Sequence, residues 1–455
     1  MRPFLQNFLR SNTFALSRPF STGPAVQRYT FEPFGPEETP YWQRLKPWQD
    51  VTHEQFLSHE WQVNKTPKGP EKLLDFLEQI VPAKITDSRP GCREPIATRK
   101  AFLLDIQEGI KAAPMAVRLT PHLLSIANWE SPFDDPIVRQ FIPLKSNLVP
   151  DHPMATFDSL DEKKYSPVID LVHRYPDRVL FLATGTCPSY CRFCTRSYAI
   201  GASTETVQKT LPRPGRAKWT TMLNYVEETP VVRDVVVSGG DSYTLHPEHM
   251  TFIGDRLLGM DHMKCFRIAA RGLSFCPMRI IDPSDSWSES LIDLSDRGRQ
   301  SDKGVVLHTH FNHPAEINWV TRRAMRYLFR RGVTVRNQTV LLRGVNDNVE
   351  TMSTLIRSLA DLHVKPYYVY QMDMVKGVED LRTPLSTVLE LESQITGTIT
   401  GFDLPKFVVD LPGGGGKRPA STYDTYDKET GVSTFRAPGI AGDRVFTYYD
   451  PLPNA

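Results

Sequence analysis

The chain has 455 residues, of which 40% are hydrophobic and 23% are charged. These are the proportions of an ordinary globular protein, so a chain that is disordered or fibrous throughout is excluded. The 54 basic residues almost balance the 52 acidic ones, and the net charge of +2 gives no general attraction for nucleic acid or anionic lipid. No apolar run approaches the roughly 18 residues of a membrane span. We therefore expect neither nucleic acid nor a membrane as a partner.

Residues 1–31 have the composition of a targeting sequence. The segment has no acidic residue before Glu32, and it contains several serines and threonines and scattered phenylalanines. Its basic residues are Arg2, Arg10, Arg18 and Arg28. This pattern is typical of a mitochondrial transit peptide, and residues 18–21 (Arg-Pro-Phe-Ser) resemble a site at which such peptides are cut. We expect the protein in the mitochondrial matrix; the alternative is a disordered tail without a targeting role.

The rest of the chain divides into three parts. Residues 32–165 contain helix-like stretches and Pro-rich joints, which predict a helical N-terminal extension. Residues 166–400 alternate short β-branched or aromatic runs with helical stretches. Residues 401–455 form a C-terminal segment that begins with a further strand-like run at 406–410.

The alternation in the central part predicts an α/β fold. The predicted strands cover residues 179–184, 234–238, 266–270, 304–308, 334–342 and 366–371, and the predicted helices lie near 217–228, 246–259, 316–331, 348–362 and 384–397. Six parallel βα units make most of a TIM-type barrel, so we expect a partial (βα)6 barrel; a doubly wound sheet is the alternative. Both folds bind ligands at the carboxyl ends of the strands. Polar residues recur there, at Thr186, Cys187, 238–241, Arg271, 308–310, Gln338 and Asp373.

Three of the six cysteines lie in one loop, directly after the first predicted strand. Cys187, Cys191 and Cys194 leave three residues and then two residues between them. Three thiolates bind three irons of a [4Fe–4S] cluster and leave the fourth iron open for a small molecule. The alternatives are a zinc site completed by a distant histidine or by Cys265 or Cys276, and thiols that are close by chance.

A glycine-rich loop, residues 410–417 (DLPGGGGK), follows the last predicted strand. It is not a phosphate-binding Walker loop, because Leu411 and Arg418 stand where that pattern needs Gly and Ser or Thr. A lysine presented on such a loop, here Lys417, suits a Schiff base with pyridoxal phosphate (PLP). A solvated hinge is the alternative.

Two arginines and a tyrosine precede the first predicted strand. Arg174, Tyr175 and Arg178 could grip a phosphate, since a guanidinium binds phosphate oxygens through two parallel hydrogen bonds. A solvated turn at the entry of the strand is the alternative.

The cysteine loop resembles that of radical S-adenosylmethionine (SAM) enzymes, which have the pattern CxxxCxxC with an aromatic residue, here Phe193, before the last cysteine. The segment Ser238, Gly239, Gly240 and Asp241 resembles the one that holds the SAM amino group in those enzymes. Taken alone, it would be an ordinary turn.

Seven segments in order resemble the lysine 2,3-aminomutase family of radical SAM, PLP-dependent enzymes. They are HRYPDRV, CxxxCRxCTR, SGGD, HTHFNHP, NQTVLLRGVND, KPYYVYQMD and FVVDLPGGGGK. The resemblance implies a partial (βα)6 barrel that holds both cofactors, a cluster on the three loop cysteines and PLP on Lys417. It also implies that Arg174, Tyr175 and Arg178 lie at the PLP phosphate, and that His310 and Gln338 contact SAM.

The same resemblance implies how the substrate is held. Arg196 matches the residue that pairs with the substrate carboxylate, and Asp373 and Asp410 match the two carboxylates around its far amino group. Two carboxylates in one closed site raise each other's pKa unless a cation lies between them, and the side-chain ammonium of lysine is such a cation. We expect migration of the amino group between the α- and β-carbons of L-lysine. The alternatives are another basic amino acid such as arginine, lysine destined for attachment to another protein, and a non-catalytic iron–sulfur protein.

The sequence departs from the family pattern at two places. Residues 271–273 (Arg-Gly-Leu) stand where Arg-Thr-Pro is usual, beside the strand that holds SAM. Asn348 stands where bacterial members have a zinc-binding cysteine, so we expect no structural zinc.

Two segments and two further cysteines have no assigned role. Residues 203–216 and 284–303 are expected to be surface insertions, and Cys265 and Cys276 to be buried apolar thiols. The resemblance also implies a homo-oligomer and a ferredoxin-like or flavodoxin-like electron donor.

Overall fold

The computed structural model describes residues 35, 37–89, 94–210, 212 and 215–452. The predicted transit peptide and Cys92 lie outside the described residues. None of the described helices is long and apolar enough to cross a membrane.

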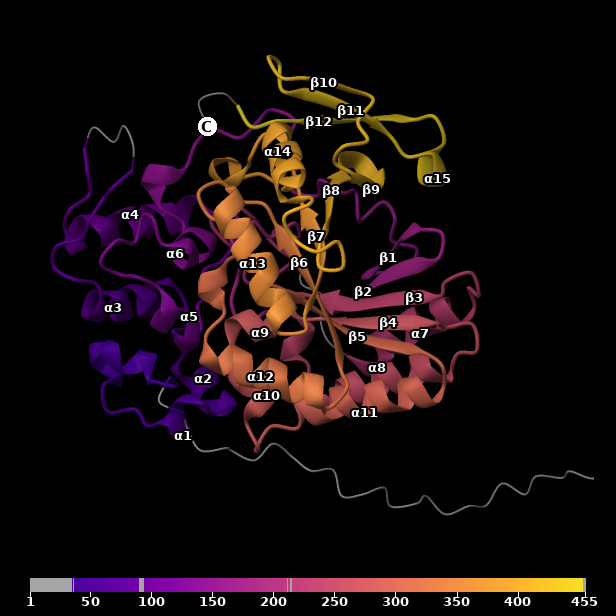
Figure 1. The fold of residues 1–455 in the computed structure, drawn as a ribbon, viewed down its shortest axis with the longest axis horizontal. Coiled ribbons are helices and arrows are strands. Elements are labelled where there is room, and N and C mark those ends of the chain that lie inside the picture. The colour runs from indigo at the N-terminus through magenta and orange to yellow at the C-terminus, as the bar shows by residue number, and fades with distance from the viewer. Residues whose placement is uncertain (1–34, 36, 90–93, 211, 213–214, 453–455) are drawn as a thin grey trace, which may run out of the picture.

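A nine-stranded sheet forms the centre of the molecule, with its strands in the order in which they occur along the chain (Figure 1). Its strands are β1 (Leu171–Tyr175), β2 (Arg178–Thr184), β3 (Asp234–Gly239), β4 (Cys265–Ala269), β5 (Gly304–His310), β6 (Thr334–Val340), β7 (Lys365–Tyr370), β8 (Lys406–Leu411) and β9 (Gly416–Pro419). Strands β2 to β8 are parallel, and β1 and β9 are antiparallel to their neighbours at the two ends. A doubly wound sheet would reverse its strand order at a switch point, so this unbroken order confirms the barrel-type prediction.

Helices follow the parallel strands and cover the outside of the sheet (Figure 1). They are α7 (Arg216–Glu227), α8 (Pro247–Gly259), α9 (Gly272–Phe275), α10 (Met278–Ile281), α11 (Trp287–Gln300), α12 (Trp319–Arg330), α13 (Val349–Asp361) and α14 (Leu385–Ile395). Asn318 and Asn348 cap α12 and α13, because their side chains accept hydrogen bonds from the first free backbone N–H groups. Asn348, at the position of the bacterial zinc ligand, therefore has a structural role of its own.

The expectation that residues 284–303 form a surface insertion is wrong. Most of the segment is α11, which packs against α8 and β5 as a regular helix of the barrel. Trp287, Leu291 and Leu294 are fully buried, and their spacing of four and then three residues is that of one helix face. Residues 203–216 form no helix or strand over their described part before α7 begins at Arg216.

The N-terminal extension covers one side of the barrel (Figure 1). Its helices are α1 (His53–Phe56), α2 (His59–Lys65), α3 (Pro70–Ile80), α4 (Arg99–Ala112), α5 (Pro121–Ile126) and α6 (Pro136–Phe141). The rings of Trp42 and Phe56 stack at 4.1 Å in its core. The extension is tied to the barrel where the Thr120 hydroxyl donates to the Phe275 carbonyl and the Tyr190 N–H donates to the Arg118 carbonyl.

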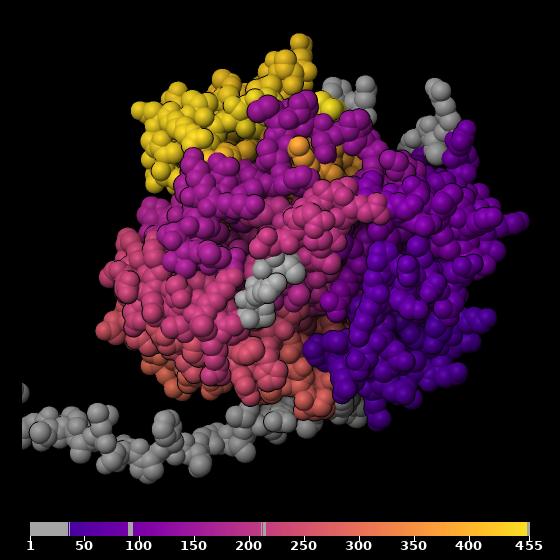
Figure 2. All heavy atoms as spheres, turned by 180° about the vertical axis from the view of Figure 1, so that it is seen from behind, coloured from indigo at the N-terminus to yellow at the C-terminus, as the bar shows by residue number. Residues whose placement is uncertain are grey.

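The C-terminal part adds a small antiparallel sheet above β8 and β9 (Figure 1), and the C-terminal residues, in yellow, lie together at one end of the molecule (Figure 2). It consists of β10 (Thr425–Asp427), β11 (Val432–Arg436) and β12 (Val445–Tyr449), with α15 (Pro438–Ala441) between the last two strands. The buried Tyr448 hydroxyl donates to the Met372 carbonyl and accepts from Gln371 at the end of β7. This sheet therefore holds the strand end that carries Asp373.

Candidate active site

A cavity of about 170 Å³ opens among the strands of the barrel, and it receives side chains from β1, β2, β3, β4, β5, β6, β7, β8 and β9. Of the predicted site residues, those that line it are Arg174, Tyr175, Arg178, Arg196, Ser238, Gln338, Asp410 and Lys417. Groups that are more than 200 residues apart in the chain thus meet in one place, as Arg174 and Asp410 do with a separation of 236.

Asp410 lies between two cations in this cavity. One guanidinium nitrogen of Arg174 donates to both of its oxygens, at 2.9 and 3.0 Å, and the Lys417 Nζ lies 3.0 Å from the carboxylate. Burial opposes ionisation of Asp410, but the charges of Arg174 and Lys417 prevail and lower its pKa. The pKa of Lys417 is raised, because Asp410 outweighs the effect of burial. Lys417 is therefore held as an ammonium group in this arrangement.

The residues expected at the PLP phosphate fit a phosphate. Arg174 and Arg178 flank the Tyr175 ring, at 5.1 and 4.0 Å from its centre. The buried Nη1 of Arg174 and Nε of Arg178 have no hydrogen-bond acceptor among the described residues. An anion with several oxygens satisfies such donors. Residues 174–178 include the turn that joins β1 to β2, and the side chains of Arg174 and Arg178 on either side of this turn line the cavity.

The glycine loop is packed rather than solvated. A Cβ at Gly414 would lie 2.3 Å from the Tyr165 ring, and one at Gly416, where φ is 75°, would lie 2.4 Å from Ile440. The Lys417 N–H donates to the Tyr175 hydroxyl at 3.1 Å, which joins β9 to the β1–β2 hairpin. The hinge alternative is therefore wrong, since the loop fixes Lys417 at the cavity wall.

Arg196 is paired with a residue that the sequence analysis missed. The Glu162 carboxylate accepts from its Nε at 2.8 Å and from its Nη2 at 2.6 Å, and both side chains line the cavity. Tyr198 also donates to Glu162, at 3.1 Å. Nothing in the sequence indicated Glu162, because it lies in a run of charged residues, 161–164 (DEKK), that has the pattern of a solvated surface.

Asp373 lies outside the lining of the cavity, against the loop that carries the cysteines. Its carboxylate accepts from the Thr195 hydroxyl at 2.5 Å. Burial, followed by the charge of Asp410, raises its pKa to about 6. The two aspartates thus influence each other as expected, but only Asp373 shifts upward, since Asp410 has two cationic partners.

The two glycines of the segment 238–241 allow close packing of one backbone segment against another. A Cβ at Gly239 would lie 2.1 Å from the Thr184 carbonyl oxygen, and one at Gly240 would lie 2.3 Å from that of Thr186. The end of β3 therefore lies directly against the loop that leads to Cys187. Asp241 is buried, accepts from the Tyr243 and Arg271 backbone N–H groups, and has its pKa raised by burial to about 7.

His310 and Gln338, which are expected to contact SAM, are register partners on the parallel strands β5 and β6, so they lie side by side at the same depth. Gln338 lines the cavity, whereas the His310 Nε2 lies 2.9 Å from the Asn312 side-chain oxygen and its ring lies 5.9 Å from that of Phe193. His308, two residues earlier, does line the cavity, and its buried Nε2 has no partner among the described residues. Burial lowers the pKa of His308 to about 3, so its imidazole is neutral. Alternation along β5 directs 308 and 310 to the same face of the sheet.

The three loop cysteines are reduced thiols that fit an iron–sulfur cluster. Burial raises the pKa of each, to about 12 for Cys191, and the charges of the other thiolates add to this for Cys187. Arg271 donates a hydrogen bond to the Cys191 sulfur at 2.9 Å. Among the residues that the structure describes, no three His, Cys, Asp or Glu side chains converge on a single metal ion. Each thiolate of a cubane binds a different iron, so the cysteines need only surround a common volume.

The other described cysteines lie elsewhere. Cys276 is buried, as expected, but Cys265 is half-buried, because it is the first residue of β4 and lies at the amino end of that strand. The cysteine loop follows the carboxyl end of the parallel strand β2, so Cys265 lies at the opposite end of the barrel and cannot complete a zinc site there.

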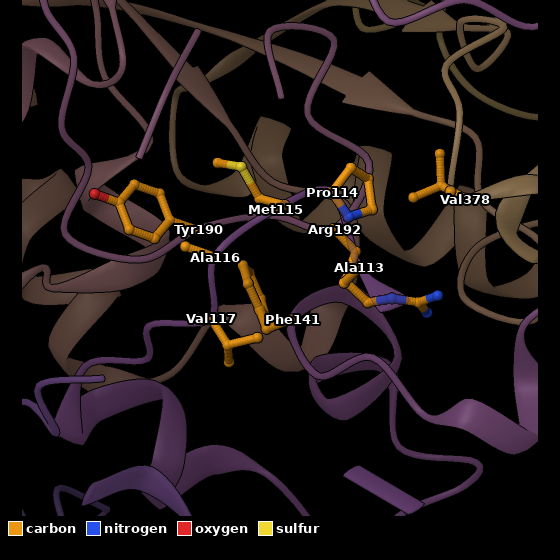
Figure 3. A pocket seen from close by; sticks show the side chains of 10 residues that line it. Ala113, Pro114, Met115, Ala116, Val117, Phe141, Tyr190, Arg192 and Val378 are labelled. Atoms are coloured by element: carbon orange, nitrogen blue, oxygen red, sulfur yellow. The ribbon is translucent and has the colours of Figure 1, made fainter. Parts of the chain in front are cut away.

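The segment 113–117 covers the cysteine loop from the outside. Met115, Tyr190 and Ile200 pack together, with Cys187 and Cys194 against them. Figure 3 shows Met115 and Tyr190 at a cavity of about 10 Å³, which has room for one water molecule and no larger ligand. The described part of 203–216 adds to this cover, since Thr206 donates to the Ala113 carbonyl at 3.0 Å. These contacts cover one side of the loop, while the three cysteines themselves are half-buried.

Comparisons with known proteins find relatives over most of the chain. The L-lysine 2,3-aminomutase of Acetoanaerobium sticklandii is 38% identical over 317 residues, which cover 69% of this chain and 71% of the relative. That of Fusobacterium nucleatum is 37% identical over 376 residues, or 83% and 79% of the two chains. The glutamate 2,3-aminomutase of Clostridioides difficile is 31% identical over 301 residues, or 66% of each chain.

No protein-family profile matches the chain. The solved structure of Streptococcus suis SuiB bound to S-adenosylmethionine covers 54% of it with 14% identity and a TM-score of 0.38. This chain matches more than two thirds of the length of the two L-lysine 2,3-aminomutases, with 38% and 37% of the aligned residues identical. The chain is a member of the lysine 2,3-aminomutase family, the radical SAM aminomutases.

Proposed function

We propose that the protein interconverts L-lysine and L-β-lysine, using a [4Fe–4S] cluster, SAM and PLP. The observation that carries the proposal is the cavity in which Arg196, Asp410 and Lys417 meet. A guanidinium and a carboxylate in one cavity suit a zwitterion with a cationic side chain, and the relatives named for lysine support the same substrate.

When bound, the cluster and SAM supply a radical that abstracts hydrogen, and PLP supplies an electron sink for the migrating amino group. The chain positions these groups. Cys187, Cys191 and Cys194 hold the cluster, Lys417 holds PLP, and the free donors of Arg174 and Arg178 hold its phosphate.

Asp410 then selects the substrate. If Lys417 holds PLP, its Nζ, which lies 3.0 Å from Asp410, would be engaged by the cofactor and would no longer be free to pair with this carboxylate. A buried carboxylate that loses a cationic partner favours another cation in its place. The far ammonium group of lysine is that cation, and Arg196 binds the carboxylate at the other end of the substrate.

A glutamate substrate fits this cavity less well, although a relative bears that name. Glu162 and Asp410 both line the cavity, and Asp373 lies behind it. An acidic side chain would face these carboxylates, and buried contacts between like charges cost several kcal/mol. Arginine remains the second candidate, because a guanidinium also satisfies Asp410.

The test is reconstitution of the purified chain under anaerobic conditions with iron, sulfide, PLP, SAM and dithionite. We expect β-lysine from L-lysine, and no β-amino acid from L-glutamate. Turnover of L-arginine in place of L-lysine would overturn the substrate, and the absence of SAM cleavage with every amino acid would overturn the reaction class.

We propose further that residues 1–31 direct the protein to the mitochondrial matrix, where a ferredoxin-like or flavodoxin-like protein reduces a homo-oligomer. The support is the acid-free, arginine-rich composition of the segment and the need for a one-electron donor. A fluorescent protein fused behind residues 1–31 should enter mitochondria, and the same fusion with Arg2, Arg10, Arg18 and Arg28 changed to Glu should not. Retention of both fusions in the cytosol would overturn the targeting proposal.

A further inference from the structure

Arg271 is a buried cation that the proposed chemistry does not use. It lies two residues after the end of β4, its side chain is 6% exposed, and its backbone N–H donates to Asp241 at 3.0 Å. Three phenylalanine rings surround the guanidinium, with centres 5.0 to 5.3 Å from its carbon; they are Phe141, Phe193 and Phe275. Removing a guanidinium from water is costly, so its place calls for an anionic partner.

One of the closest contacts of Arg271 is the sulfur of a predicted cluster ligand, which becomes an anionic thiolate when it binds iron. Its Nη1 donates to the Cys191 sulfur at 2.9 Å. Its Nη2 donates to the Gln140 side-chain oxygen at 2.8 Å and lies 3.3 Å from Glu316. Its Nε is buried and has no acceptor among the described residues.

Glu316 does not depend on Arg271 for its hydrogen bonds. This fully buried carboxylate accepts from the Ser274 hydroxyl at 2.5 Å and from the Gln140 side-chain nitrogen at 3.0 Å. It also accepts from the backbone N–H groups of Asn312 and His313, both at 3.1 Å. If Arg271 served only as an ion-pair partner of Glu316, its shortest contacts would be with that carboxylate. Instead, its contact with Glu316 is 3.3 Å, which is longer than its contacts with the Gln140 amide oxygen at 2.8 Å and with the Cys191 sulfur at 2.9 Å.

The unusual residue after Arg271 supports its position. A Cβ at Gly272 would lie 2.1 Å from the ring of the buried Tyr243. Only glycine allows this ring to pack under the start of α9, and Tyr243 is anchored by a hydrogen bond from its hydroxyl to the Cys276 carbonyl at 2.9 Å. The departure from the family pattern at 272 is therefore matched by Tyr243, and it leaves Arg271 facing the cysteine loop.

We propose that Arg271 raises the reduction potential of the iron–sulfur cluster, and this inference rests on the cluster of the proposed function. Reduction adds one electron, supplied by an external iron–sulfur or flavin donor, and makes the cluster with its three thiolates one charge unit more negative. A buried cation and an N–H···S hydrogen bond stabilise the more negative state. Glu316 opposes this effect, because its negative charge lies in the same network.

The two charges allow tests of opposite sign. In Arg271→Gln the midpoint potential of the cluster should fall, and in Arg271→Lys, which keeps the charge, it should fall less. In Glu316→Gln, which is nearly isosteric, the potential should rise. Arg323→Gln is the matched control, since Arg323 is also 6% exposed and paired with a glutamate, Glu38, but lies on α12 away from the cysteines. Its potential should equal that of the wild type.

The measurement is an anaerobic potentiometric titration with dithionite, followed by electron paramagnetic resonance, on full-length protein reconstituted with iron and sulfide and without SAM, PLP or amino acid. Equal potentials in the wild type and Arg271→Gln at equal cluster content would overturn the proposal. If Arg271→Gln assembles no cluster, Glu316→Gln decides, and an unchanged or lower potential overturns it. A wild type that binds no cluster would instead overturn the proposed function itself.

Discussion

Glu162 holds the Arg196 guanidinium by its side, through Nε at 2.8 Å and Nη2 at 2.6 Å. A guanidinium has two edges on which it binds a carboxylate through paired hydrogen bonds. Glu162 occupies the edge that contains Nε, and the edge that contains Nη1 remains for a second carboxylate. Arg196 is thereby oriented before a substrate enters the cavity.

This relationship predicts that Glu162 acts on the substrate through Arg196. Glu162→Gln should weaken the hold on the guanidinium by about 1.5 kcal/mol, the lower end of the roughly 1.5–3 kcal/mol that a hydrogen bond to a charged group contributes. The KM for L-lysine should rise about tenfold with little change in kcat. Calorimetric binding of L-lysine to the protein with PLP measures the same loss without turnover. A KM equal to that of the wild type would contradict the prediction.

Asp410 is expected to be essential for a cationic substrate. Asp410→Asn removes the charge that faces Arg174 and Lys417, and loss of one partner of a buried charge pair costs about 2–5 kcal/mol. The kcat/KM for L-lysine should therefore fall at least about thirtyfold. The absorbance of the cluster should be unchanged, because Asp410 touches none of the cysteines. Full activity on L-lysine in this variant would exclude Asp410 from substrate recognition.

Asp373 should give the enzyme a pH dependence near its pKa of about 6. Below this pH Asp373 is protonated and no longer attracts an ammonium group, so kcat/KM for L-lysine should fall as the pH decreases through 6. Asp373→Asn should abolish this limb and leave a lower, flatter profile. A limb near 6 that persists in Asp373→Asn would assign it to another group, such as Asp241, whose pKa is about 7.

The raised pKa of Asp373 also affects the stability of the fold, which should decrease with rising pH, whereas kcat/KM should increase. Asp373 has its folded pKa raised above the ordinary value of 3.8, so its contribution to stability is present at low pH and is lost as the pH rises through about 6. Between pH 4 and 7, the wild type should therefore lose more stability than Asp373→Asn, in which this position does not titrate. Parallel curves of unfolding free energy for the two proteins would contradict the assignment.

Gly272 is predicted to be intolerant of any side chain. Gly272→Ala brings a Cβ to 2.1 Å from the Tyr243 ring, and overpacking of a core costs about 1–3 kcal/mol. Gly401→Ala is the control, since nothing lies within 4 Å of its added Cβ. Thermal unfolding should show a lower Tm for the first variant alone. In Tyr243→Leu, which removes the facing ring, Gly272→Ala should cost less; an equal cost would place the strain elsewhere.

Local patterns were enough to predict the barrel. Strands β2 to β8 and the helices α7, α8, α12, α13 and α14 follow from β-branched runs alternating with amphipathic stretches. Helix α11 was missed, although Trp287, Leu291 and Leu294 have helical spacing, because the residues around them are charged and polar. Strand β1 was missed because the Pro176 turn was interpreted as the entry to a single strand.

The contacts within the site could not be predicted in the same way. The cysteine loop and Lys417 were found because their chemistry requires particular residue types at short spacings. Glu162 and the Arg271 network depend on contacts between segments far apart in the chain, and their local sequences have no distinguishing pattern. That His308 rather than His310 lines the cavity likewise depends on contacts of the folded barrel, where the His310 ring is hydrogen-bonded to Asn312.

The central claim is that this cavity supports migration of an amino group within lysine. The most direct test is to give the reconstituted enzyme L-lysine labelled isotopically at its α-nitrogen and to locate the label in the product by NMR. We predict β-lysine with the label on the nitrogen bonded to the β-carbon. Release of the label as ammonia, or the absence of β-lysine while SAM is cleaved, would contradict the account.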